Sequence, residues 1–237
     1  MQPIIDLTSL IGDETPDDIA MLWEKAYKYQ QYVAGICTYA SRLPYVMEEC
    51  IFLIPHIVVV ANFPSGQNKL ATTKFEVAYA MANNATEIDM VANWQEFNRS
   101  MSGIEAFVAT WKHQIGPDIK MKLILESGHM RKEYLYAACM QAMKGGVDFL
   151  KTSTGKTQIG ATPEAVSVIA QAIKDYYNQT GKQVGLKISG GISDGKTADS
   201  YISLCHKILS LEWVEQTDTF RIGIGPNSTV LEDWDCK

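Results

Sequence analysis

The sequence has few cysteines and few histidines, and neither kind of residue is spaced like a metal site. Its 237 residues include five cysteines, which are scattered, odd in number and without a CxxC pair. Reduced thiols of a cytoplasmic protein fit this pattern better than a disulfide framework or a zinc site. The four histidines show no metal-ligand spacing and no nucleophile pairing, so we expect structural or surface roles for them. These residues are Cys37, Cys50, Cys139, Cys205, Cys236, His56, His113, His129 and His206.

Long apolar runs and an excess of positive charge are also missing. No apolar run approaches the ~20 residues of a membrane-spanning helix, so we expect no membrane association. The net charge of -6 argues against general nucleic-acid binding but permits a local basic pocket for a phosphorylated small molecule. The chain reaches Asp6 without a basic region, which is not the pattern of a signal peptide. With 46% hydrophobic and 20% charged residues, a large core is expected.

Eight short strand-like segments run through the chain, most of them separated by helix-like stretches. They cover residues 4–10, 33–39, 56–63, 85–92, 120–127, 147–154, 183–189 and 219–225. Thr15-Pro16 and Thr162-Pro163 are typical helix starts, and apolar spacing predicts further helices within 74–81 and 134–143. Eightfold alternation predicts parallel strands with right-handed crossovers that close into a barrel. No linker divides the chain, so we expect an α/β fold, a single-domain TIM (β/α)8 barrel over residues 1–237.

The alternation of side chains within three segments indicates which residues face the barrel interior. In residues 5–8, 87–92 and 184–189, bulky apolar side chains alternate with small or ionisable ones. Since the bulky apolar set belongs against the helices, Asp6, Asp89 and Lys187 are expected to point inward. Barrel active sites lie at the carboxyl ends of the strands. One inward polar residue is compatible with a satisfied core group, whereas several converging residues favour catalysis.

Lys151 stands at the end of residues 147–150, a short segment dominated by apolar and aromatic side chains. A buried lysine costs stability unless it has a partner or a chemical role, and the alternative is a strand-end lysine whose amine reaches water. Burial and a nearby cation lower the pKa of an amine, and a neutral amine forms a Schiff base with a carbonyl. Neighbouring strands lie ~4.8 Å apart, so Lys187 is the expected cation, and Asp89 is expected to move protons.

Glycines follow the last three strand segments, at Gly155, Gly190-Gly191, Gly223 and Gly225. Glycine lets backbone N–H groups approach an anion, and loops after the last barrel strands commonly bind phosphate. Lys156 can add positive charge to such a site. Gly155-Lys156-Thr157 also resembles the end of a P-loop, but Leu150 occupies the position where that motif needs another glycine.

These residues together resemble the deoxyribose-phosphate aldolase family of class I aldolases. The resemblance covers most of the chain in order, and the segment Lys151–Lys156 (KTSTGK) is its most specific part. The matching segments are 5–8, 58–66, 87–91, 122–126, 148–156, 186–192 and 220–223.

The resemblance implies a role for each matching residue. Lys151 would be the Schiff-base lysine, Lys187 the second lysine and Asp89 the proton-relay carboxylate. The implied reaction is reversible cleavage of 2-deoxy-D-ribose 5-phosphate to D-glyceraldehyde 3-phosphate and acetaldehyde, without metal or organic cofactor, in deoxyribonucleotide and carbohydrate catabolism. Its partners would be small aldehydes and sugar phosphates, and the protein a homodimer or other homo-oligomer. The substrate-binding residues expected from the resemblance and from the glycine loops are Asp6, Thr8, Cys37, Thr152, Gly155, Lys156, Gly190, Gly191, Gly223 and Gly225.

The sequence departs from the family pattern in its phosphate loops. Ser193 stands where arginine is frequent, and Gly225-Pro226 replaces small hydroxyl residues. These differences motivate the hypothesis that unphosphorylated aldehydes are accepted. Two alternative functions are a sugar-phosphate-binding barrel without catalysis and a related Schiff-base aldolase with a different donor.

Overall fold

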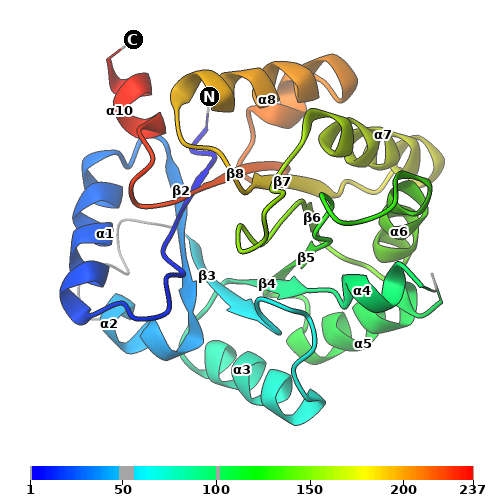
Figure 1. Cartoon of the computed structure of the whole chain (residues 1–237), viewed down its shortest axis with the longest axis horizontal. Helices are drawn as coiled ribbons and strands as arrows, with labels where there is room; N and C mark the ends of the chain where they lie inside the picture. Colours follow the sequence, from blue (N-terminus) through cyan, green and yellow to red (C-terminus); the bar gives the residue numbers. More distant parts are fainter. Residues whose placement is uncertain (1, 48–55, 100–101, 237) are drawn as a thin grey trace.

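In the computed structural model, which describes residues 2–47, 56–99 and 102–236, eight parallel strands form a closed barrel in chain order (Figure 1). Each strand pairs with the next, and the eighth pairs with the first. The strands are β1 (Ile5–Thr8), β2 (Val33–Tyr39), β3 (His56–Ala61), β4 (Glu87–Val91), β5 (Lys120–Ile124), β6 (Phe149–Lys151), β7 (Gly185–Ser189) and β8 (Phe220–Ile224). Every strand lies within its predicted segment, so the expected TIM-barrel architecture is confirmed. Cys50 lies outside the described residues.

Helices surround the barrel on its outer side (Figure 1). They are α1 (Pro16–Lys28), α2 (Leu43–Met47), α3 (Leu70–Ala82), α4 (Trp94–Phe97), α5 (Ile104–Ile115), α6 (Lys132–Lys144), α7 (Pro163–Thr180), α8 (Gly195–Ile208), α9 (Leu211–Val214) and α10 (Val230–Asp235), with a 3-10 turn η1 (Ala40–Arg42). The helices predicted within 74–81 and 134–143 are parts of α3 and α6. Within the described ranges, no helix has both the length and the apolar character needed to cross a bilayer.

Two helix starts form as their sequences predict. The Thr15 hydroxyl accepts a hydrogen bond from Asp18 N at 3.2 Å, and the Asp18 carboxylate accepts one from Thr15 N at 2.8 Å. At α7, Thr162 accepts a hydrogen bond from Ala165 N at 3.2 Å. A proline follows each cap, where its missing N–H costs no helical hydrogen bond. These caps fix the points at which α1 and α7 begin, after the loops that follow the carboxyl ends of β1 and β6.

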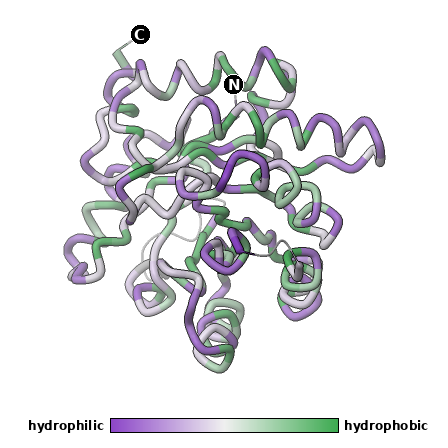
Figure 2. The backbone as a smooth tube through the Cα atoms, turned by 45° about the vertical axis from the view of Figure 1, so that its right-hand side comes forward, coloured by the Kyte–Doolittle hydropathy of each residue, from purple (hydrophilic) through white to green (hydrophobic). Residues whose placement is uncertain are grey.

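The strand side chains divide between two environments. Outward residues such as Ile88, Met90 and Ile188 pack with the helices in one large apolar core. Hydrophobic colouring accordingly runs along the central strands, and polar stretches lie on the outer helices (Figure 2). Inside the barrel, a second apolar cluster fills the region beside β2 to β5 and contains Leu10, Cys37, Val58, Val60, Phe63, Val91 and Ile124. The remaining interior holds charged groups and the ring of Phe149, whose centroid lies 5.8 Å from Lys122 Nζ and 6.0 Å from Arg221 Cζ.

Candidate active site

Lys151 and Lys187 occupy paired positions on adjacent strands, β6 and β7. Both amines contact one carboxylate oxygen, because Lys151 Nζ lies 2.7 Å and Lys187 Nζ 2.8 Å from Oδ2 of Asp89 on β4. Lys151 is 2% exposed, and the other two residues are fully buried. The structure therefore brings together the three residues predicted to be catalytic.

Beneath this trio, further ion pairs extend across the barrel interior. Lys187 lies 2.5 Å from Asp6, and Lys122 on β5 donates to Asp89 Oδ1 at 2.9 Å and also contacts Glu87. Arg221 on β8 contacts Asp6 at 2.5 Å and Glu87 at 2.9 Å. We call the whole set the ionic cluster, which consists of Asp6, Glu87, Asp89, Lys122, Lys151, Lys187 and Arg221.

Sequence reasoning assigned no role to Lys122 or Arg221. The signal was present in the sequence, since Lys122 alternates with Met121 and Leu123 as Asp89 alternates with its apolar neighbours. Strand register then places Lys122 beside Asp89 and Arg221 beside Lys187. Applied to every strand, the inward-facing rule would have found both residues.

The ionic cluster holds three carboxylates and four basic groups. Burial opposes charge on all seven, but partners of opposite sign outweigh it for six of them. The pKa values of the three carboxyl groups are accordingly lowered, and those of Lys122, Lys187 and Arg221 are raised. Lys151 differs from the other six. Burial lowers its pKa and the charge on Lys187 lowers it further, and together they outweigh the opposite effect of Asp89. A neutral Lys151 leaves three positive and three negative charges.

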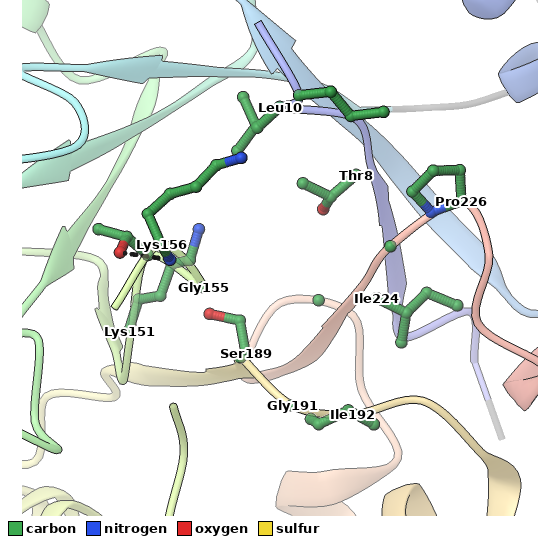
Figure 3. Close-up of a pocket in the computed structure, with 15 residues that line it drawn as sticks. Thr8, Leu10, Lys151, Gly155, Lys156, Ser189, Gly191, Ile192, Ile224 and Pro226 are labelled. Atoms are coloured by element: carbon green, nitrogen blue, oxygen red, sulfur yellow. Dashed lines mark hydrogen bonds between the residues drawn. The ribbon is translucent and has the colours of Figure 1, made fainter. Parts of the chain in front are cut away.

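A pocket of about 230 Å³ opens above Lys151 at the carboxyl ends of the strands (Figure 3). Figure 3 shows Lys151 and Lys156 on one side and Thr8, Ile224 and Pro226 on the opposite side. Its lining residues are Thr8, Leu10, Ile11, Lys151, Thr154, Gly155, Lys156, Ser189, Gly190, Gly191, Ile192, Gly223, Ile224, Gly225 and Pro226. The pocket thus joins the lysine of lowered pKa to all three glycine loops predicted from the sequence.

Three residues predicted to bind substrate do not line this pocket. Asp6 is fully buried between Lys187 and Arg221. Cys37 is also buried, its Sγ lies 4.0 Å from Asp89 Oδ2, and burial raises the pKa of its thiol. The Thr152 hydroxyl donates to Ser189 O and accepts from Ser189 N, both at 2.9 Å. Thr152 therefore ties β6 to β7, and a direct contact of these three with substrate has no support in the geometry.

Glycine occupies these loop positions for different local reasons. Gly155, Gly190 and Gly191 have φ angles of 74°, 93° and 84°, a region that side chains disfavour. A side chain at Gly223 would place its Cβ 3.3 Å from Lys187 Cε, so this glycine also makes room for the second lysine. Ser193 lies outside the pocket lining, and its carbonyl accepts a hydrogen bond from Thr229 N at 2.8 Å.

Comparison with known proteins identifies the family of the chain. The family model of the DeoC/LacD family of aldolases matches residues 4–200. A deoxyribose-phosphate aldolase from Agrobacterium fabrum is 33% identical, with 97% of this chain and 87% of that protein aligned. The Homo sapiens protein of the same name is also 33% identical, over 97% of this chain and 76% of its own. A tetrameric deoxyribose phosphate aldolase from Aeropyrum pernix shares the fold, with a TM-score of 0.76, 24% identity and coverage of 98% and 89%. The chain belongs to the DeoC/LacD family of aldolases.

Proposed function

We propose that this protein is a class I aldolase that reversibly cleaves 2-deoxy-D-ribose 5-phosphate to D-glyceraldehyde 3-phosphate and acetaldehyde. One observation carries the chemistry: within the ionic cluster, the lysine whose pKa is lowered is also the one that opens onto the pocket. The substrate is proposed from the names of the relatives. The pocket supports the coarser proposal of a carbonyl compound that carries an anionic group, because Lys151, Lys156 and the glycine loops line it.

In the proposed mechanism, the neutral amine of Lys151 attacks C1 of the open-chain sugar to give a carbinolamine, which loses water to form an imine. Removal of the C3 hydroxyl proton then breaks the C2–C3 bond. The electron pair moves to the imine, glyceraldehyde 3-phosphate leaves, and an enamine stays on the lysine. Protonation at C2 and hydrolysis release acetaldehyde and the free amine.

Asp89 and Lys187 are assigned the proton transfers that accompany these steps. Asp89 Oδ2 is within hydrogen-bond distance of both amines, which suits a group that passes protons to the reacting nitrogen, directly or through a water. Lys122 also holds Asp89, at its other oxygen. The carboxylate is therefore fixed in position during the reaction.

We assign the phosphate group of the substrate to the rim of the pocket that the glycine loops form. The backbone around Gly190, Gly191 and Gly225 lines that rim, and Lys156 supplies a cationic side chain. Backbone N–H groups at glycine turns and a lysine are a frequent combination at phosphate sites.

Trapping with acetaldehyde and borohydride tests this function. Reduction of the imine should add an ethyl group to Lys151, located by peptide mass spectrometry. Lys151→Ala should abolish cleavage and trapping while the circular dichroism spectrum stays unchanged, and Lys182→Ala, at an exposed lysine, should keep both. Trapping at another lysine, or cleavage by Lys151→Ala, would refute the assignment.

We further propose that the protein is a homo-oligomer that works in the cytoplasm. Support for an oligomer comes from exposed apolar side chains on α3, where Phe75 is 70% and Leu70 59% exposed. Cys37, Cys139 and Cys205 are buried free thiols, which suits a reducing compartment. Light scattering after gel filtration would test the first proposal, and cell fractionation the second.

A further inference from the structure

Glu126, just beyond the end of β5, is a buried carboxylate outside the ionic cluster. Its φ angle is 52°, a left-handed conformation that residues other than glycine rarely adopt. Within the described residues no cation forms an ion pair with it, and its partners are neutral donors. From the sequence alone, Glu126 could either line the pocket or satisfy a neighbour, and the structure shows the second arrangement.

The Glu126 carboxylate ties together both ends of a four-residue turn. The Thr154 hydroxyl donates to Oε2 at 2.6 Å. The Thr157 hydroxyl lies 3.2 Å from Oε1 and 3.1 Å from Ile159 O, and its single proton is shared between these two acceptors. Thr154 N also approaches Oε1 at 3.3 Å. Because the Thr154 hydroxyl donates its proton to Glu126, its lone pairs accept from Lys156 N at 3.0 Å. The backbone of Lys156 is thus linked to the carboxylate through one hydroxyl.

The segment that follows the turn is held by close backbone packing on both sides. A Cβ at Gly128 would lie 2.7 Å from Ile159 O, and one at Gly160 would lie 2.4 Å from Gly190 O. Ala161 N donates to the same Gly190 oxygen at 3.0 Å. The segment after β6 therefore packs between the turn after β5 and the turn after β7.

Lys156 is the charged residue of the turn that reaches the pocket. Figure 3 shows its side chain extending towards Leu10 at the rim. In the described part of the chain its amine makes no hydrogen bond or ion pair, so it is available to an anionic substrate group. The position of this amine depends on the backbone that Glu126 holds.

We propose that Glu126 is a positioning residue for substrate selectivity, which fixes the turn of residues 154–157 so that Lys156 meets the phosphate of the substrate. The inference rests on the proposed function, because it assumes a phosphorylated substrate. A carboxylate suits this role since both oxygens accept hydrogen bonds, whereas glutamine would present an NH2 group to one of the hydroxyl donors.

The test compares deoxyribose 5-phosphate with deoxyribose in Glu126→Gln. The KM for the phosphorylated sugar should rise about tenfold, the ratio that about 1.4 kcal/mol produces. The KM for deoxyribose and both kcat values should stay within about twofold. Thr157→Val removes one donor with little change of shape and should raise the same KM by about threefold. Glu24→Gln, at an exposed position on α1, is the matched control and should change nothing.

A double-mutant cycle with Lys156→Met identifies the residue through which Glu126 acts. If Glu126 works through Lys156, then Glu126→Gln adds no further KM increase in the Lys156→Met background. Equal KM increases for both sugars, or full additivity with Lys156→Met, would overturn the inference. If Glu126→Gln fails to fold, Thr157→Val alone and with Lys156→Met gives the same decision. Wild-type protein that cleaves neither sugar would refute the proposed function itself, whereas wild-type cleavage with unchanged variant ratios overturns only the role of Glu126.

Discussion

Replacement of Lys187 by methionine should raise the pKa of Lys151. The two amines contact the same Asp89 oxygen at 2.7 and 2.8 Å, so they lie no more than 5.5 Å apart. Two unit charges at that separation repel by about 3 kcal/mol at an effective dielectric constant of about 20. Removing this repulsion favours the protonated form of Lys151, and about 3 kcal/mol corresponds to about 2 pKa units.

The charge balance of the ionic cluster also predicts that the pKa of Lys151 rises. Without Lys187, three carboxylates face only Lys122 and Arg221 as fixed cations, and a proton on Lys151 restores neutrality. The neutral amine then becomes scarcer at neutral pH, by roughly a hundredfold for a shift of about 2 units.

The assay is the rate of borohydride-trapped imine formation with acetaldehyde, measured from neutral to alkaline pH. Lys187→Met should be slow near pH 7 and should recover as the pH rises, with its profile displaced by about 2 units. Lys174→Met, at an exposed lysine on α7, should retain the wild-type profile. A Lys187→Met protein that is slow at every pH with an undisplaced profile would show that Lys187 does not act through the pKa of Lys151.

Three further outcomes are expected. Asp89→Asn leaves three buried lysines without their shared anion, so the free energy of unfolding measured in urea should fall by about 3–5 kcal/mol. Asp118→Asn, at an exposed site, is the control and should leave it unchanged. The pKa values of Asp6, Glu87 and Asp89 are lowered in the fold, so stability is present above the ordinary carboxyl pKa of about 4 and is lost as the pH falls below it. A melting temperature that stays constant from about pH 6 to pH 3 would contradict this. Ser193→Arg should raise the preference for deoxyribose 5-phosphate over deoxyribose by about tenfold in kcat/KM, and an unchanged ratio would count against the hypothesis that Ser193 relaxes phosphate selectivity.

Patterns with a fixed spacing could be predicted from the sequence. The eight strands, the capped starts of α1 and α7 and the inward direction of Asp6, Asp89 and Lys187 all follow from periods of two and from local capping chemistry. The proximity of Lys151 and Lys187 could also be predicted, because they end adjacent strands and the strand register places them side by side.

What could not be predicted depends on contacts between segments distant in the chain. The bonds of Thr152 to Ser189 and of Glu126 to Thr157 are set by how neighbouring loops pack, which no local spacing encodes. The left-handed backbone of Glu126 is likewise invisible in the sequence, because the residue is not a glycine. Cys37 matched a family position, but its burial against Asp89 appears only once the barrel closes.

The set of charges inside the barrel is odd in number, and this has a consequence for protein engineering. An odd set cannot pair off completely, and the member whose pKa burial lowers, Lys151, is the one that lines the pocket. A designer who wants a reactive amine in another barrel could begin with a closed, neutral group of buried ions and add a single lysine at its solvent-facing edge. Transferring the lysine alone would not transfer the charged neighbours that tune its pKa, and its reactivity depends on that pKa.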